Sequence, residues 1–475
     1  MIPITEYAGR DVAVYGLGRT GLSAAKALMA GRARVHAWDE NADSRAKAEA
    51  AGIHLTDLNK REWQNFAALV LSPGIPYRFP EVHPLVKFAQ ATNVPVVGDM
   101  ELFARAVQSL PERGRPKIIG ITGTNGKSTT TALIGHILTE TGYDVRVGGN
   151  IGTGVLDLPP LHANAVYVLE LSSYQLDLVK SLHCDVAVML NISPDHLDRH
   201  GGMKGYVDAK RRIFLNQQPG DTAVVGVDDL ITQAIAMDLT ARGGVRVAQV
   251  ASQFALGRGV SAVEGRLFDS LSGNAERVGD LRDALSLPGR HNHQNAAAAY
   301  AACRAIGLDP TRIMAAIKTF PGLAHRMEMV GEVEGVRFVN DSKATNAQAA
   351  EQALRSYPRV YWIAGGVAKS DGITPLNSLF SRVAKAYLIG AAEADFAREL
   401  AGKAETVSCG TMSAAVAAAY RDARASGETD PVVLLSPACA SFDQYRDFEA
   451  RGEDFREIVQ GLSGQSTRQS VMETV

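Results

Sequence analysis

The chain lacks several features that would direct it toward particular classes of protein. Its 475 residues include only four cysteines, without a C-x-x-C pair, which argues against a disulfide framework and suits reduced thiols in the cytosol. No stretch approaches the roughly 18 to 20 apolar residues that span a bilayer, and MIPITEYAGR carries no signal-peptide pattern. The formal net charge of -2 gives no bulk attraction to nucleic acid or anionic membranes. We therefore expect a cytoplasmic protein that binds no nucleic acid and does not insert into a membrane.

Short apolar runs alternate with amphipathic helical stretches along the whole chain. These runs are DVAVYG (11–16), KIIGIT (117–122), AVYVLELSS (165–173), VAVMLNIS (186–193), VYWIAGG (360–366) and VVLLSPA (432–438). Continuous apolar strands between helices are typical of parallel sheets covered on both faces, so an α/β fold is predicted. The polar segments SLPERGRP (109–116) and FPGLAH (320–325) indicate linkers. They divide the chain into three predicted domains, 1–112, 113–322 and 323–475.

A glycine-rich turn follows the first predicted strand. GLGRTG, with Gly16, Gly18 and Gly21, opens a helix, and Asp39 ends the next predicted strand, RVHAWD. This is the fingerprint of a dinucleotide site, in which glycines allow close backbone approach, the helix N-terminus attracts phosphate and the acid accepts a hydroxyl hydrogen bond. The ligand can be NAD or another diphosphate, and SPG (72–74) adds backbone donors after a further strand. Close helix packing alone remains a third explanation.

The stretch GITGTNGKSTT (120–130) nearly matches the phosphate loop G-x-x-x-x-G-K-[ST], but its first glycine lies one residue too early. A strand passes through glycine-rich backbone into a helix, so free N–H groups from Gly123 to Ser128 can surround phosphate oxygens. Lys127 would neutralise phosphate charge and the Ser128 hydroxyl would hold Mg²⁺. The pattern therefore predicts an ATP site.

Two further segments place metal-binding side chains after strands. Glu170, in ELSSYQL, follows one strand, and NISPDHLDRH, with His196, follows the next. Ligands of a doubly wound sheet gather at the C-terminal strand ends. Glu170 and His196 are therefore candidate ligands of a nucleotide-bound metal.

The ordered series of motifs resembles the Mur ligases over nearly the whole chain, and is most similar to their D-glutamate-adding branch. The series is GTNGKS, GGNIG, ELSSYQL, NISPDHLDRH, YVDAKRRIF, LPGRHNHQNAAAA, HRME, NDSKATN and LLSPACASFDQY. The resemblance implies three α/β domains, each with a largely parallel sheet: a Rossmann-like N-terminal domain for the UDP-sugar, a P-loop ATPase-like central domain and a Rossmann-like C-terminal domain for the amino acid.

The resemblance also implies a reaction. ATP would phosphorylate the carboxylate of UDP-N-acetylmuramoyl-L-alanine, and the amino group of D-glutamate would attack the acyl phosphate, giving an amide, ADP and phosphate. A carboxylate is a poor electrophile at neutral pH, whereas its acyl phosphate carries a good leaving group. The expected cofactors are ATP and two Mg²⁺ ions. We expect a monomer whose partners are these three substrates.

The resemblance further assigns site residues. Those for ATP are Gly123, Thr124, Asn125, Gly126, Lys127, Ser128, Thr129, Asn292, Asn295, Arg326, Asp341 and Lys343. Those for metal are Ser128, Glu170, His196 and Lys210, the last as a carbamate, and the catalytic set is Lys127, His196 and Lys210. Those for the UDP-sugar are Gly18, Arg19, Thr20, Asp39, Ser72, Pro73, Gly74 and Asn150. Those for D-glutamate are His196, Thr345, Lys369, Ser441, Phe442 and Phe448.

Two departures from the family pattern affect these assignments. Glu40 and Asn41 replace a threonine and an arginine that often follow the aspartate, so contacts to the uracil edge are expected to differ. Phe442 stands where leucine is common, which alters the expected shape of the amino-acid pocket.

Other functions are weighed against this prediction. An NAD-dependent oxidoreductase would explain GLGRTG and Asp39 but leave GTNGKS, HRME and NDSKATN unused. A nucleotide-driven switch would hydrolyse ATP without an acceptor amino acid. Within the family another amino acid is an alternative, although the D-N-P-R motif typical of the diaminopimelate-adding enzymes is missing from this sequence.

Overall fold

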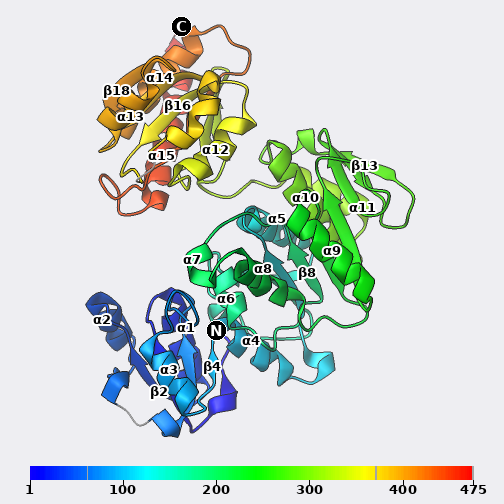
Figure 1. Ribbon diagram of the computed structural model, residues 1–475. Helices are drawn as coiled ribbons and strands as arrows, with labels where there is room; N and C mark the ends of the chain where they lie inside the picture. The colour runs from blue at the N-terminus through cyan, green and yellow to red at the C-terminus, as the bar shows by residue number, and fades with distance from the viewer. Residues whose placement is uncertain (61–62, 370–371, 473–475) are drawn as a thin grey trace. The chain divides into compact units, whose positions relative to one another are not determined.

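The computed structural model describes residues 1–60, 63–369 and 372–472. The chain divides into two compact units, one of Met1–Leu281 with His291–Thr319 and one that begins at Phe320 and includes Arg282–Arg290. Two sheets lie in the first unit and a third sheet lies in the second (Figure 1). Most neighbouring strands are parallel, which confirms the α/β prediction. The domain boundaries at residues 112 and 322 remain predictions.

The N-terminal sheet has four parallel strands in the order β2-β1-β3-β4. Val12 and Val14 face a core cluster shared with helix α1, whereas Ala13 and Tyr15 face another cluster shared with α3. Successive side chains of a strand point to opposite faces, so a continuous apolar strand needs a helix on each face. The strands are β1 Asp11–Tyr15, β2 Arg34–Trp38, β3 Phe66–Leu71 and β4 Val96–Val97, and the helices are α1 Arg19–Ala30, α2 Ala42–Ala50, α3 Pro84–Ala91 and α4 Asp99–Gln108.

The central sheet has nine strands in the order β13-β12-β11-β10-β9-β8-β5-β7-β6. Strands β5 to β11 pair in parallel, while β12 and β13 add an antiparallel edge. Because β8, β5 and β7 are neighbours, the loops at their C-terminal ends lie side by side. The strands are β5 Lys117–Thr122, β6 Asp144–Gly149, β7 Ala165–Glu170, β8 Val186–Met189, β9 Thr222–Gly226, β10 Arg246–Ala251, β11 Val260–Val263, β12 Arg266–Asp269 and β13 Glu276–Asp280.

Helices pack against this sheet and carry the remaining motifs. Helix α5 contacts β5, β6 and β7, and α9 contacts β9 and β10. The helices are α5 Lys127–Glu140, α6 Ser173–Asp177, α7 Leu197–His200, α8 Met203–Arg211, α9 Leu230–Arg242, α10 Arg290–Ala305 and α11 Pro310–Lys318. Buried alanines fill the middle of α10, from Ala296 to Ala302 with only Tyr300 between them, so this helix can approach its neighbours closely.

A buried carboxylate joins α4, the last helix of the N-terminal domain, to the segment that follows α6 in the central domain. Glu101 on α4 has no exposed surface, and its carboxylate accepts hydrogen bonds from the backbone N–H groups of Lys180 and Ser181 at 2.7 and 2.8 Å. The Ser181 hydroxyl and Arg105 Nε also donate to it, at 2.8 and 2.9 Å. The charge is thus fully satisfied, which is the condition under which a buried carboxylate holds two layers together.

The second unit has a six-stranded sheet in the order β14-β15-β19-β16-β17-β18, antiparallel only between β14 and β15. Trp362 and Leu434 face a cluster with α12 and α13, while Tyr361 and Val433 face one with α14 and α15. The strands are β14 Glu328–Val333, β15 Val336–Asn340, β16 Val360–Gly365, β17 Val383–Ile389, β18 Thr406–Gly410 and β19 Val432–Leu435, and the helices are α12 Ala347–Ser356, α13 Glu393–Leu400, α14 Met412–Ala425 and α15 Phe448–Met472.

Across the described ranges, no helix combines the length and apolarity needed to cross a membrane.

Candidate active site

The glycine loop between β5 and α5 depends on two glycines for its shape. Gly123 and Gly126 have φ angles of 150° and 83°, which favour glycine. A Cβ on Gly126 would lie 2.2 Å from Oδ1 of Asn295, so α10 packs directly on the loop. Gly120 lies inside β5, where an added Cβ would meet Cys184 Sγ at 2.7 Å. Gly120 is therefore a packing glycine of the strand, and the loop itself begins at Gly123.

Residues after β8 hold the loop from outside. The Asn191 carbonyl accepts from the Thr124 N–H at 2.9 Å, and its side-chain Oδ1 accepts from the Asn125 N–H at 2.9 Å. The hydroxyls of Thr124 and Tyr206 lie 3.0 Å apart. These contacts fix the conformation of the loop, which is the preorganisation that a phosphate cradle needs.

Lys127, at the start of α5, reaches back across the loop. Its Nζ donates to the carbonyls of Gly123 and Thr124 at 3.0 and 2.8 Å. Ser128 and Thr129 follow in the first turn and are 6% and 8% exposed. The structure therefore brings the Lys127 ammonium and the Ser128 hydroxyl to one end of the helix, where the helix dipole also favours an anion.

Glu170 ends β7 beside this loop and carries an unsatisfied buried oxygen. The side chain is 2% exposed, and Oε1 accepts from Asn150 Nδ2 at 2.7 Å. Its Oε2 is buried and has no hydrogen-bond partner within the described ranges. Because a buried carboxylate oxygen without a donor is costly, this atom suits a metal cation, and oxygen ligands are those that Mg²⁺ prefers.

Lys210 on α8 is a buried lysine that contacts the start of the glycine loop. It is 1% exposed, and its Nζ donates to the Gly123 carbonyl at 2.7 Å and lies 3.4 Å from the Thr122 hydroxyl. Burial, followed by the charge of Lys127, lowers the pKa of Lys210 to about 7. The lowered pKa favours the neutral amine of Lys210, which is the form that reacts with carbon dioxide.

His196 precedes α7 with a left-handed φ of 51°. Its side chain is about half exposed, and Nε2 lies 3.4 Å from Asp195 Oδ2. The Tyr174 ring packs against it at 5.0 Å between centroids. His196 is thus accessible from solvent, unlike His200, which is buried and hydrogen-bonded to Ser173 Oγ at 3.0 Å.

In the part of the chain that the structure describes, no group of three or more histidine, cysteine, aspartate or glutamate side chains is arranged so that it could hold a metal ion. The predicted set differs from such a cluster because it contains a serine and a modified lysine. Among the predicted metal residues, the unsatisfied oxygen of Glu170 is the feature that fits a cation.

Two of the predicted ATP residues, Asn292 and Asn295, lie on α10. Asn292 and Asn295 are 5% and 3% exposed, and Asn295 Nδ2 donates to Asn292 Oδ1 at 3.2 Å. Asn295 also borders Gly126. The structure therefore joins these two asparagines to each other and to the phosphate loop.

Asp39 braces two turns of the N-terminal domain. Its Oδ2 accepts from the Leu17 N–H at 2.5 Å and its Oδ1 accepts from the Asn41 N–H at 2.8 Å. Asn41 in turn caps α2. Ser72 Oγ donates to the Gly16 carbonyl at 2.7 Å, so the two predicted UDP-sugar loops meet.

Two more predicted UDP-sugar residues connect this domain to the central domain. Arg19, in the first turn of α1 with Thr20 and after Gly18, donates to the carbonyls of Gly152 and Asn150 at 3.0 and 3.5 Å. Asn150 is the residue that donates to Glu170. A chain of contacts thus runs from the first glycine turn to the predicted metal position.

The second unit holds the remaining predicted residues near β15 and α15. Asp341 is 6% exposed and accepts from the Met327 N–H at 3.2 Å and the Ser436 hydroxyl at 2.8 Å. Burial raises the pKa of Asp341 to about 7, although its hydrogen bond from Ser436 and the charge of Arg326 oppose the shift. Lys343 Nζ lies 5.5 Å from the centre of the Phe448 ring, so the structure brings these two predicted residues together.

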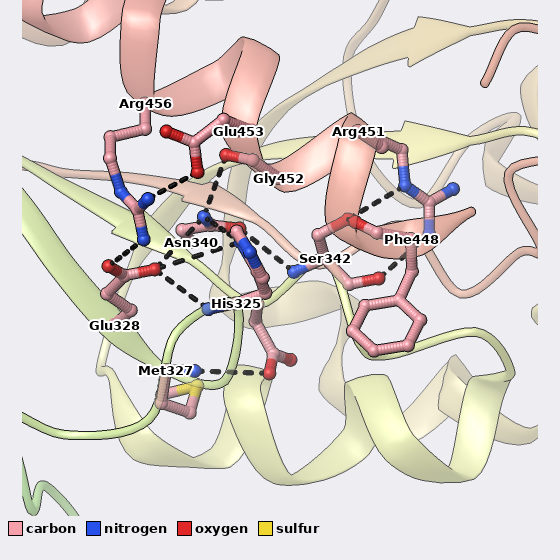
Figure 2. A network of polar contacts seen from close by, with 11 residues as sticks. His325, Met327, Glu328, Asn340, Ser342, Phe448, Arg451, Gly452, Glu453 and Arg456 are labelled. Atoms are coloured by element: carbon pink, nitrogen blue, oxygen red, sulfur yellow. Dashed lines mark hydrogen bonds and ion pairs between the residues drawn. The ribbon is translucent and has the colours of Figure 1, made fainter. Parts of the chain in front are cut away.

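Helix α15 anchors the NDSK segment, as Figure 2 shows. Arg451 is 1% exposed and donates from Nε to Ser342 Oγ at 3.0 Å and from Nη2 to the Ser342 carbonyl at 2.8 Å. Ser342 Oγ donates to the Phe448 carbonyl at 2.8 Å, and Asn340 Nδ2 donates to the Gly452 carbonyl at 3.0 Å. The backbone that carries Asp341 and Lys343 is therefore held on both sides.

The predicted D-glutamate residues differ in exposure. Ser441 is 2% exposed, whereas its neighbour Phe442 is 74% exposed and Lys369 is also exposed. Thr345 is partly buried, and its N–H donates to the Lys343 carbonyl at 2.9 Å. Of this set, Thr345 and Phe448 both contact Lys343.

Sequence reasoning missed several residues that shape the site. They are Thr122, Tyr174, Asn191, Arg199, Tyr206, Ser342 and Arg451. All except Arg451 lie inside quoted stretches of sequence, so those stretches carried the signal. Only the folded contacts distinguish a residue that braces the site from one that merely accompanies it.

Comparisons with known proteins give three domain matches and several full-length relatives. Residues 10–98 match the MurD-like N-terminal domain of Mur ligases, residues 121–303 match the Mur ligase middle domain and residues 325–439 match the glutamate ligase domain. The UDP-N-acetylmuramoylalanine–D-glutamate ligase of Caulobacter vibrioides is 60% identical over 463 residues, which are 98% of each chain. The enzyme of the same name from Nitrobacter hamburgensis is 50% identical over 98% of this chain and 99% of its own.

Solved structures show the same fold at low identity. The UDP-N-acetylmuramate–alanine ligase of Thermotoga maritima aligns with a TM-score of 0.56, 16% identity, and coverage of 95% of this chain and 99% of its own. A UDP-N-acetylmuramoylalanyl-D-glutamyl-2,6-diaminopimelate–D-alanyl-D-alanyl ligase from Acinetobacter baumannii aligns with a TM-score of 0.53 and 20% identity, over 83% of this chain and 85% of its own.

Proposed function

This chain belongs to the Mur ligase family, and from that premise we propose that it joins D-glutamate to UDP-N-acetylmuramoyl-L-alanine with conversion of ATP to ADP and phosphate. The observation that carries the proposal is the 50 to 60% identity, over nearly the full chain, to relatives named as D-glutamate ligases. The reaction is a step in the synthesis of peptidoglycan precursors. The packing of Gly120 and the loop at Gly123–Ser128 support an ATP site of the family's own form.

The reaction has two steps. In the first, a carboxylate oxygen of the L-alanyl group attacks the γ-phosphorus of ATP and ADP leaves, giving an acyl phosphate. In the second, the amino group of D-glutamate attacks the acyl carbon, phosphate leaves and the amine loses a proton. Both steps pass through anionic states, so the Lys127 ammonium and the loop's backbone N–H groups other than those of Thr124 and Asn125, which donate to Asn191, would stabilise them.

The residues present fit a magnesium site. Ser128 Oγ, Glu170 Oε2 and His196 would hold Mg²⁺, with Lys210 contributing oxygen as a carbamate. Mg²⁺ supplies charge neutralisation at the phosphates when bound. Glu170 supports this assignment because its second oxygen is buried without a donor. Asn150 orients that carboxylate through its other oxygen.

Lys210 supports carbamate formation through its burial beside the loop. A neutral amine can add carbon dioxide and lose a proton, which replaces a buried cation by an anionic ligand. Lys210→Ala should abolish most activity and raise the Mg²⁺ concentration for half-maximal rate, and ¹³C-bicarbonate should give the wild type a carbamate carbonyl resonance that the variant lacks. Wild-type kinetics of the variant at limiting Mg²⁺ would exclude this role.

The other assigned residues follow by family match. Gly18, Arg19, Thr20, Asp39, Ser72, Pro73, Gly74 and Asn150 are proposed for the UDP-sugar, and His196, Thr345, Lys369, Ser441, Phe442 and Phe448 for D-glutamate. Asn292, Asn295, Arg326, Asp341 and Lys343 are proposed to bind ATP with the glycine loop and Thr129. Both Asp39 oxygens accept hydrogen bonds from backbone N–H groups. We therefore propose that Asp39 braces the loop that binds the substrate and also accepts a hydrogen bond from the substrate.

A coupled phosphate-release assay tests the function. With UDP-N-acetylmuramoyl-L-alanine and ATP present, D-glutamate should start turnover, while L-alanine and diaminopimelate should not. Equal turnover with all three amino acids, or none with D-glutamate, would contradict the assignment. Phosphate release without any amino acid would favour a nucleotide switch.

A further inference from the structure

Arg199 on α7 is a buried cation that forms no ion pair with a carboxylate of the described residues, although the charges of Asp177 and Asp198 act on it from farther away. It is 7% exposed, and its guanidinium donates to the backbone carbonyls of Ile75, Phe79 and Pro73 at 2.6, 3.4 and 3.5 Å. Its Nε has no hydrogen-bond partner among the described residues. Because a buried charge is usually paired, this arrangement calls for an explanation beyond packing.

The three carbonyls belong to the loop after β3, residues 73–79, which contains the predicted UDP-sugar segment. Arg199 itself lies three residues after His196, in the segment predicted to bind metal and D-glutamate. A second contact reinforces the connection, since a Cβ on Gly201 would lie 2.7 Å from Phe79 Cζ. The loop 73–79 is therefore fastened to the chain around α7 at two places.

Arg199 also reaches His196 through one aromatic ring. Its guanidinium carbon lies 5.2 Å from the centre of the Tyr174 ring, and that ring packs against His196 at 5.0 Å. A guanidinium over a ring face is held by the ring's electrostatic field. Movement of the loop 73–79 thus acts on Arg199 directly and on His196 through Tyr174.

We propose that Arg199 is a positioning residue that couples the sugar-nucleotide loop 73–79 to the His196 segment. Sugar-nucleotide binding at the loop would then order His196 for the acceptor reaction. The inference rests on the proposed function, because it needs the sugar nucleotide at loop 73–79. The absence of an ion pair with a carboxylate of the described residues is consistent with this role, since the diphosphate substrate brings negative charge to the same loop.

Hydrogen exchange of the full-length protein, with and without UDP-N-acetylmuramoyl-L-alanine, tests the coupling directly. In the wild type the sugar nucleotide should slow amide exchange both in residues 72–80 and in residues 193–201. In Arg199→Met, saturating sugar nucleotide should still protect residues 72–80 but leave residues 193–201 exchanging as in the free protein. Equal protection of residues 193–201 in both proteins would overturn the proposal.

Kinetics separate coupling from a merely structural role. Arg199→Met should raise the KM for UDP-N-acetylmuramoyl-L-alanine and for D-glutamate, each by about tenfold, with the KM for ATP within about twofold. Arg199→Lys keeps the charge but loses the planar fork, so it should show the same pattern to a smaller extent and remains informative if the methionine variant does not fold. Equal loss toward all three substrates would contradict the proposal.

Arg382 in the second unit provides the matched control. Arg382 is partly buried, and like Arg199 it donates to backbone carbonyls, those of Tyr357 and Arg355 at 2.8 and 3.5 Å. Arg382→Met should lower thermal stability without changing the ratio of the three KM values. A wild type without D-glutamate-dependent phosphate release would refute the proposed function, whereas an active wild type whose Arg199 variants behave like Arg382→Met would refute only the coupling.

Discussion

Asp341 should make the second unit less stable as the pH rises, and Asp341→Asn should remove that dependence. Burial raises the pKa of this acid from 3.8 to about 7. The folded protein therefore disfavours the ionised form of Asp341. The folded state keeps its full stability below pH 3.8, where the acid is neutral in both states, and loses stability as the pH rises through about 7. Asparagine keeps the shape and can still accept the Met327 N–H.

The size of the effect follows from the shift. About three pKa units correspond to about 4 kcal/mol of unfolding free energy once the acid is ionised in both states. About 2.5 kcal/mol of this difference should develop between about pH 5 and about pH 8. Burial also raises the pKa of Asp99, to about 6, but Asp99 is present in both proteins and its contribution cancels in their difference.

Native-state hydrogen exchange in increasing urea measures the free energy segment by segment, and peptides from β15 and β19 are the suitable probes. Asp341 lies directly after β15, and its N–H donates to the Leu435 carbonyl in β19 at 2.7 Å. Asp341→Asn should exceed the wild type in stability by a margin that grows with pH. A margin that is constant from pH 5 to pH 8 would refute the reasoning, because it would show that the acid is not the titrating group.

Three further variants test separate parts of the structure. Gly126→Ala should raise the KM for ATP, because its Cβ would lie 2.2 Å from Asn295 Oδ1 at a positive φ; an unchanged KM would show that the loop tolerates the move. Glu170→Gln should require about tenfold more Mg²⁺ yet unfold at no lower temperature without Mg²⁺, because it removes an unsatisfied buried charge; equal Mg²⁺ titrations would contradict the metal assignment. Glu101→Ala should lower the unfolding free energy of the first unit by about 3 kcal/mol or more, as measured by urea denaturation, and a loss below about 1 kcal/mol would show that the carboxylate is not what joins the layers.

The sequence allowed the parallel strands to be predicted because each is a short apolar run between amphipathic helical stretches. The run 117–122 coincides with β5, and those at 360–366 and 432–438 contain β16 and β19. The antiparallel edge of the central sheet escaped prediction. Strand β13 is short, reads ERVGD and is mostly partly exposed, so its conformation depends on pairing with β12 rather than on its own pattern.

The site residues likewise divide into those set by local sequence and those set by tertiary contacts. The placement of Lys127 and Ser128 at the start of a helix could be predicted because it follows from the local pattern of a strand, a glycine-rich turn and a helix. Arg199 could not, since its role lies in carbonyls more than a hundred residues away in the chain. Lys210 was predicted only by family resemblance, because an isolated helix lysine is ordinarily solvated and its burial depends on the tertiary structure.

Substitutions in the alanine-rich interior of α10 can change the glycine loop, although these alanines lie in the core. Asn295 immediately precedes Ala296, and its Oδ1 occupies the space that a larger residue at Gly126 would need. Replacing a buried alanine such as Ala298 or Ala299 by valine would push the helix outward and carry Asn295 away from the loop. Natural variation in this run should therefore be restricted by the fit of Asn295 against Gly126.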